Sequence, residues 1–157
     1  MPIRTRTLWR VPLYCTAAGF LCYHASAFLT GRFAVVVQPD SAYGVDPVRS
    51  LVISAILMAF TVVIGAKAVF SGMTRRELFC SASLWVGIGL ILSALQLSLG
   101  STLPAFLRLG FLQEWSRPLS QLVDLLTGTF WPGFVLQLLA PYLFVLFGQR
   151  EHPRKNS

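Results

Sequence analysis

The stretch CYHASAFLTGR, residues 22–32, decides how many times the chain crosses a membrane. It ends an apolar run that follows a basic N-terminus, and Ala25-Ser26-Ala27 is the A-x-A pattern that signal peptidase cleaves. Residues 1–27 therefore read either as a removable signal peptide or as a membrane helix that stays. Because apolar residues continue beyond Ala27, we expect the helix to be retained, and the intact mass of the protein separates the two alternatives.

The apolar run also carries a stripe of small residues at helical spacing. Its members are Cys15, Ala18, Gly19, Cys22, Ala25 and Ser26. In lipid, helices approach closely where small side chains line the contact. A removable segment needs no packing face, so the stripe also favours a retained helix that packs against neighbours.

The composition places the whole chain among membrane proteins. Hydrophobic residues make up 55% of the 157 residues and charged residues only 12%, which is about half the charge of a soluble domain. Windows of about 20 apolar residues match a hydrocarbon core of ~30 Å, and they fall at about 11–30, 51–70, 80–100 and 129–148. We predict an all-α, polytopic membrane protein, a single domain over residues 1–157, whose four transmembrane helices form a bundle.

The net charge of +7 is distributed along the chain as membrane topology requires, and this explains it better than nucleic-acid binding does. Surplus cations lie before the first window, after the second and after the fourth, and cytoplasmic segments carry such an excess. We therefore expect an inner-membrane protein with both termini cytoplasmic. Arg75 and Arg76 form its cytoplasmic basic cluster, which is assigned to topology and lipid headgroups before any docking role. The lipid bilayer is the expected partner, a membrane-protein partner or a homo-oligomer stays open, and no nucleic acid is expected.

The loop SGMTRREL, residues 71–78, predicts how the second and third windows connect. Gly72 suits the positive φ that follows a helix, and Thr74 with Glu77 forms a capping box for the next helix. We expect these two windows to form a tight antiparallel hairpin. The third helix should pack through a small or polar face and turn three leucines toward lipid. That face comprises Ala82, Val86, Gly89, Ser93, Gln96 and Gly100, and the leucines are Leu90, Leu92 and Leu97.

The segment between the third and fourth windows, residues 101–128, is too long to be a simple turn. Their first part, 103–112, reads as an interfacial or re-entrant piece. Residues 117–127 then predict an extracytoplasmic amphipathic helix with Ser116 as N-cap, lying on the membrane surface or capping the bundle. Its apolar stripe is Leu119, Leu122, Val123 and Leu126. In the last window, Pro141 predicts a kink and frees the carbonyl of Gln137.

Polar residues within membrane windows are functional hypotheses by default. The candidates are His24, Gln96 and Gln137, together with Asp124 on the amphipathic helix. Plainer roles compete with each, such as an interfacial histidine or an interhelical hydrogen bond from Gln137. The three cysteines suit packing rather than a disulfide framework. No cofactor, metal ligand set or catalytic residue is predicted.

Three functions remain open: an accessory subunit, a channel- or carrier-like subunit, and a lipid-modifying enzyme. The accessory subunit is favoured because the sequence contains no catalytic motif. The chain would be a non-enzymatic accessory or interaction subunit of a membrane assembly. As a channel- or carrier-like subunit, it would line a path with Gln96, Gln137, Ser93 and His24. As an outer-leaflet lipid-modifying enzyme, it would use His24 with Asp124 or Glu114. The carrier hypothesis is less favoured, because carriers usually hold an acidic residue within the membrane and every carboxylate here lies outside the four windows.

Overall fold

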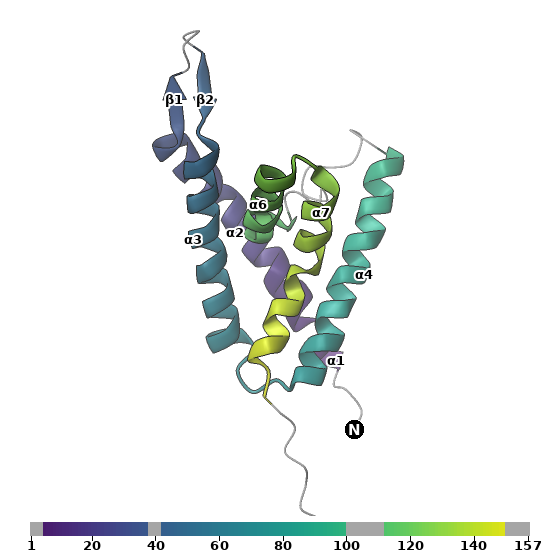
Figure 1. The fold of residues 1–157 in the computed structure, drawn as a ribbon. Coiled ribbons are helices and arrows are strands. Elements are labelled where there is room, and N and C mark those ends of the chain that lie inside the picture. The colour runs from purple at the N-terminus through teal and green to yellow at the C-terminus, as the bar shows by residue number, and fades with distance from the viewer. Residues whose placement is uncertain (1–4, 38–41, 100–111, 150–157) are drawn as a thin grey trace, which may run out of the picture.

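The structure is a computed structural model that describes residues 5–37, 42–99 and 112–149. The chain is mostly helical, with one β-hairpin at one end of a helical bundle (Figure 1). The elements are α1 (Thr5–Leu8), α2 (Arg10–Phe33), β1 (Val35–Val37), β2 (Tyr43–Val45), α3 (Pro47–Ile64), the π-helix η1 (Gly65–Val69), α4 (Arg75–Leu99), the 3₁₀-helix η4 (Glu114–Ser116), α6 (Arg117–Thr127), α7 (Phe130–Leu139) and the 3₁₀-helix η5 (Ala140–Phe147). We call the end with β1 and β2 the hairpin end, and the end with the α3–α4 connection the loop end.

The β-hairpin corrects the all-α prediction. Its strands pair antiparallel with Val35 opposite Val45 and Val37 opposite Tyr43. The run of β-branched valines favours a strand over a helix. In the sequence alone, these valines only continue the apolar run that begins in the preceding helix.

Two of the predicted spans have the length and apolarity of membrane helices. They are Pro47–Val69 and Arg75–Ser98, with mean hydropathies of 2.2 and 2.1. Only 17% and 28% of their most apolar windows are buried inside the chain. Because a soluble protein buries its apolar helices, this exposure fits helices that face lipid. Trp131–Phe147 is also apolar but shorter, and the first window lies within the continuous helix α2.

The connection between α3 and α4 has the predicted local chemistry. Gly72 adopts a φ of 88°. The Thr74 amide donates to the Glu77 carboxylate at 3.0 Å, and the Glu77 amide donates to the Thr74 hydroxyl at 3.3 Å. The positive φ and the capping box are therefore confirmed.

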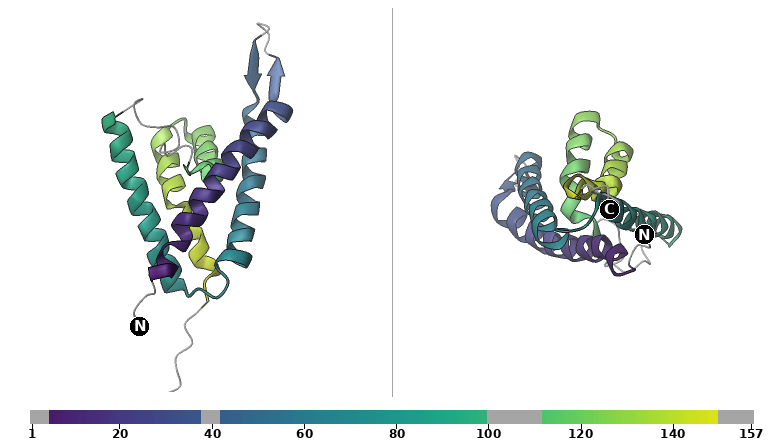
Figure 2. Two further views of the ribbon diagram at one scale, coloured as in Figure 1. Left: turned by 180° about the vertical axis from the view of Figure 1, so that it is seen from behind. Right: turned by 90° about the horizontal axis from the view of Figure 1, so that it is seen from below.

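The tight α3–α4 hairpin is wrong, because η5 lies between the two helices (Figures 1 and 2). The end of η5 is fixed to the loop between them. Arg75 donates from Nε to the Gly148 carbonyl at 3.2 Å, and the Gln149 amide donates to the Met73 carbonyl at 3.0 Å. Buried Phe144 then fills the space between the helices and packs on Phe70.

The small-residue stripe of α2 faces the interior, as predicted. Cys15, Ala18, Gly19, Cys22 and Ser26 are buried, and Ala25 is half-buried. The helix runs through Ala25–Ala27 without a break, so removal of residues 1–27 would also remove most of this packing face. On α4, Ala82 and Gly89 are buried, whereas Leu90 and Leu97 are exposed. Leu92 differs from its prediction because it packs partly buried against the core.

The backbone of residue 112 passes directly over Gly19. A Cβ atom on Gly19 would overlap the carbonyl oxygen of Leu112. Because Gly19 lies near the middle of α2, the chain enters the described structure deep in the bundle at Leu112. From there η4 and α6 lead toward the hairpin end, where the chain turns into α7 (Figure 1). The predicted interfacial or re-entrant run at 103–112 lies outside the described residues except for Leu112.

The amphipathic helix has the predicted bounds but not the predicted exposure. Pro118 and Ser120 are buried, and α6 lies against α7, where a Cβ on Gly133 would come within 2.9 Å of the Ser120 carbonyl oxygen. Leu126, by contrast, is 76% exposed. The helix therefore starts inside the bundle rather than on its outer surface. Ser120 lies inward and Leu126 outward, whereas Leu119 packs against the core and Asp124 is exposed.

We predict that Gly19→Ala destabilises the protein by about 1–3 kcal/mol, because the new methyl group must displace the Leu112 backbone. Gly31→Ala and Gly87→Ala are matched controls, since nothing lies within 4 Å of either added Cβ. Both controls should be neutral or stabilising by up to ~1 kcal/mol, as expected for glycines within helices. Unfolding of the purified variants in one detergent compares the three. Equal stability of all three would contradict the close contact.

Candidate functional site

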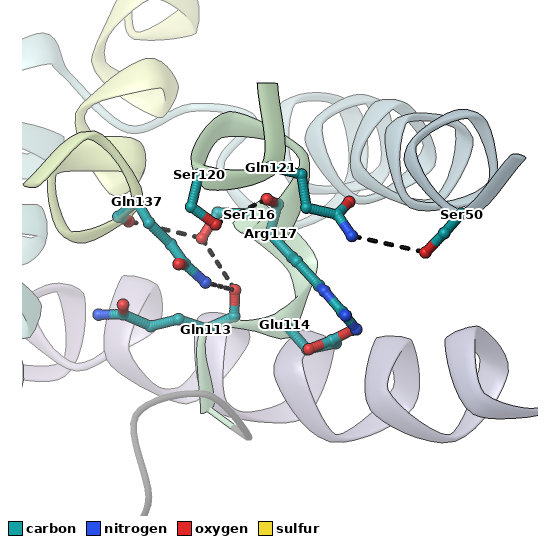
Figure 3. Close-up of polar contacts among 8 residues, drawn as sticks. All are labelled: Ser50, Gln113, Glu114, Ser116, Arg117, Ser120, Gln121 and Gln137. Atoms are coloured by element: carbon teal, nitrogen blue, oxygen red, sulfur yellow. Dashed lines mark hydrogen bonds and ion pairs between the residues drawn. The ribbon is translucent and has the colours of Figure 1, made fainter. Parts of the chain in front are cut away.

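A polar cluster lies inside the bundle where η4 meets α7 (Figure 3). Gln137 donates from Nε2 to the backbone carbonyl of Gln113 at 2.9 Å. The hydroxyl of Ser116 donates to the same carbonyl at 3.0 Å and to the Gln137 carbonyl at 3.4 Å. Both Gln113 and Ser116 are fully buried. We call Gln113, Ser116 and Gln137 the polar knot.

Pro141 explains why the Gln137 carbonyl belongs to this knot. A proline has no N–H to donate to the carbonyl four residues earlier, so that carbonyl needs other partners. Here the Ala140 amide donates to it in a 3₁₀ pattern, and Ser116 adds a second donor. The predicted coupling between the proline and Gln137 thus takes the form of a change from α7 to η5, assisted by a side chain from another element.

Two further polar contacts join α6 to its neighbours. Gln121 donates to the Ser50 hydroxyl of α3 at 3.5 Å. Arg117 donates from Nη1 to the Glu114 carboxylate at 2.7 Å. Ser116 takes the N-cap position of α6, but its side chain makes no capping hydrogen bond. Its hydroxyl is instead used in the polar knot.

The other predicted site residues do not join the knot. His24 is exposed on α2, where its ring contacts Phe20 and Tyr23. Gln96 is half-buried on α4, and Asp124 is exposed on α6. At the loop end, Arg75 holds the Gly148 carbonyl and Arg76 is exposed. Sequence reasoning missed Gln113 and Ser116 as partners of Gln137, because their pairing depends on where the backbone enters the bundle.

The β-hairpin forms a separate, outward-facing surface. Val35, Val37, Tyr43 and Val45 share one face of the hairpin, and all are exposed, with Tyr43 at 82%. The hairpin extends beyond the ends of α2 and α3 (Figure 1). Within the part of the chain that the structure describes, each strand has a single neighbour, so the outer edges are open to pairing.

The base of the hairpin is tied firmly to the bundle. The Asp46 amide donates to the Ala34 carbonyl at 2.8 Å. The Asp46 carboxylate accepts from the amides of Val48 and Arg49, which caps α3. Asp46 therefore caps α3 and also ties the end of the hairpin to the end of α2.

Among residues 5–37, 42–99 and 112–149, no three His, Cys, Asp or Glu side chains lie close enough to hold a metal ion. Asp40, another acidic residue, lies outside the described residues. Comparison with known proteins found no matching family model, curated protein or solved structure.

We predict that Gln137→Leu lowers the free energy of unfolding by about 0.5–2 kcal/mol, because it leaves a buried carbonyl with one donor fewer. Ser116→Ala should behave similarly, and the double variant should cost less than the sum of the two, since both act on the Gln113 carbonyl. Unfolding in detergent measures all three. Ser98→Ala on α4, an exposed serine bonded only to its own helix, serves as the control. Additive effects would contradict a shared knot.

Proposed function

We propose that this chain is an integral inner-membrane protein with four membrane-embedded helical segments, and that it acts as a non-enzymatic accessory subunit of a membrane assembly. The four segments are α2, α3 with η1, α4, and α7 with η5. Both termini lie in the cytoplasm at the loop end, and the hairpin end is extracytoplasmic. Support for the placement comes from helix length, lipid-facing exposure and the distribution of charge.

The lengths of the two remaining segments, α2 and α7 with η5, also fit a membrane crossing. The 24 residues of α2 extend about 36 Å at ~1.5 Å per residue, which crosses a core of ~30 Å with some tilt. The last segment combines ten α-helical and eight 3₁₀ residues. Because a 3₁₀-helix rises ~2.0 Å per residue, these give about 31 Å. The 3₁₀ stretch below Pro141 thus supplies the length that a plain α-helix of this size would lack.

The exposure of α6 supports the same placement. Leu122, Leu125 and Leu126 face outward while Ser120 faces inward. In water this arrangement would expose apolar surface and bury polar groups, which is unfavourable. Lipid around Leu122, Leu125 and Leu126 would make their exposure favourable, and Ser120 has its partner inside the protein, the Arg117 carbonyl. Asp124, which is also exposed, lies near the end of the helix.

The observation that carries the accessory role is the protruding β-hairpin. Since α2 and α3 with η1 are long enough to cross the hydrocarbon core, the hairpin extends beyond it. An exposed apolar face and two open strand edges suit addition of an extended segment from another protein. We infer that the partner is an extracytoplasmic polypeptide, which pairs with an edge and covers Val37 and Tyr43.

The other two functions lack a comparable feature. Gln137, central to the carrier hypothesis, already uses its side-chain amide on the Gln113 carbonyl. Glu114, considered as a general base, is paired with Arg117. His24 and Asp124 lie on different elements and point outward from the bundle.

A C-terminal fusion to green fluorescent protein should fluoresce, and a C-terminal fusion to alkaline phosphatase should be inactive, because the first folds only in the cytoplasm and the second only outside it. Intact mass of the purified chain should include residues 1–27. An active phosphatase fusion, or a chain shortened by those residues, would contradict the proposed topology.

Replacing the apolar face of the hairpin should detach the partner. We expect the tagged protein, purified from native membranes in mild detergent, to carry one stoichiometric extracytoplasmic protein. Val37→Thr combined with Tyr43→Ser should reduce its recovery by about tenfold or more, since two exposed apolar contacts are lost. Val52→Thr, a change of the same type on the exposed side of α3, is the control and should retain the partner. Purification of the unaltered chain alone, or equal recovery from all three, would contradict the accessory role.

A further inference from the structure

Two hollows lie one above the other between α2 and α3. The one nearer the loop end is apolar and has a volume of about 230 Å³. Its wall includes Ala17, Leu21 and Ala25 from α2, and Leu57, Phe60 and Ile64 from α3. We call it the apolar groove. In a membrane it would open sideways to lipid chains.

The second hollow lies nearer the hairpin end and has a volume of about 400 Å³. It brings together polar side chains of Tyr23, Ser26, Thr30, Ser50, Glu114 and Arg117, and the rest of its wall is Ala27, Gly31, Val35 and Val45. We call it the polar pocket. Along α2 the two hollows adjoin, because Ala25 lines the groove and Ser26 lines the pocket.

The ion pair in the polar pocket distinguishes it from ordinary lipid-facing surface. The side chain of Glu114 is only 9% exposed, whereas that of Arg117 is 43% exposed. One guanidinium nitrogen is bonded to Glu114, and a guanidinium has five N–H donors. Further donors therefore remain for a second acceptor. Charged groups within a membrane are costly unless they serve a function or are paired. Figure 3 shows the two side chains directed toward each other, and the exposed fractions show that Arg117 is the more accessible member.

We propose that the groove and the pocket together bind one aminophospholipid from the outer leaflet. An acyl chain lies in the apolar groove, and the phosphate accepts hydrogen bonds from Arg117. The primary ammonium group of the headgroup is bonded by Glu114. This site rests on the membrane placement proposed above but not on the partner of the β-hairpin.

Charge complementarity selects this class of lipid. Glu114 and Arg117 cancel, so the pocket offers an anionic phosphate no net positive charge. A headgroup that carries both a phosphate and an ammonium satisfies both members of the pair with charge-assisted hydrogen bonds. The order of the hollows gives the orientation, because the polar pocket lies at the hairpin end and the apolar groove extends toward the loop end.

The test is native mass spectrometry of the full chain in detergent, with added phosphatidylethanolamine, phosphatidylcholine and phosphatidylglycerol of identical acyl chains. The account predicts one bound phosphatidylethanolamine per chain, held about tenfold more tightly than either alternative. Equal binding of the three lipids would overturn the proposal. Resistance of the chain to alkaline extraction from membranes, measured in parallel, distinguishes a wrong site from a wrong membrane placement.

Glu114→Gln tests the headgroup contact. The amide oxygen still accepts from Arg117, but the negative charge is lost, so the pocket becomes cationic. The preference should move from phosphatidylethanolamine to phosphatidylglycerol. An unchanged preference would overturn the assignment of Glu114 to the ammonium group.

Ala17→Phe tests the acyl-chain contact by filling the apolar groove from an exposed position, which leaves the core intact. It should lower lipid binding by about tenfold. Ala94→Phe makes the same change at an exposed position on α4, and it should bind as the unaltered chain does. Equal binding by the two variants would overturn the placement of the acyl chain.

Discussion

The contact between Gly19 and the carbonyl of Leu112 is the constraint on which the rest of the structure depends. Irregular backbone is tolerated at membrane depth only where protein surrounds it. The small residues of α2 create that enclosure, since a side chain at Gly19 would occupy the path of the backbone. Once residue 112 is seated there, Glu114 and Arg117 lie beside α2, and Ser116 reaches α7.

The polar knot is the second set of contacts on which this packing depends, and it joins η4 to α7. The backbone carbonyls of Gln113 and Gln137 both lack the amide donor that a regular α-helix would supply. The hydroxyl of Ser116 donates to both of them. Pro141 causes one of these openings, and the resulting 3₁₀ segment lengthens the last helix. The same segment ends in the contact between Gly148 and Arg75, which spreads α3 and α4 apart. Pro141 therefore influences two places: the hydrogen bonds of Gln137 in the interior, and the contact of η5 with Arg75 at the loop end.

Sequence reasoning captured features that depend on neighbours along the chain. The capping box at Thr74, the positive φ of Gly72, the bounds of α6 and the inward stripe of α2 follow from spacing and residue type. It missed features that depend on distant segments, such as the separation of α3 from α4 by η5 and the partners of Gln137. The hairpin was missed for another reason. Its valines adjoin an apolar helix, and hydrophobicity alone does not mark where one element ends and the next begins.

The central claim is that the backbone of Leu112 lies inside the bundle against Gly19, near the middle of α2. The most direct measurement is a nuclear Overhauser effect between the α protons of Gly19 and the α proton of Leu112, recorded on the full chain in lipid bicelles. The account predicts a cross-peak, because the two backbones are in contact. A cross-peak from Leu112 only to lipid headgroups or water, with none to Gly19, would contradict it.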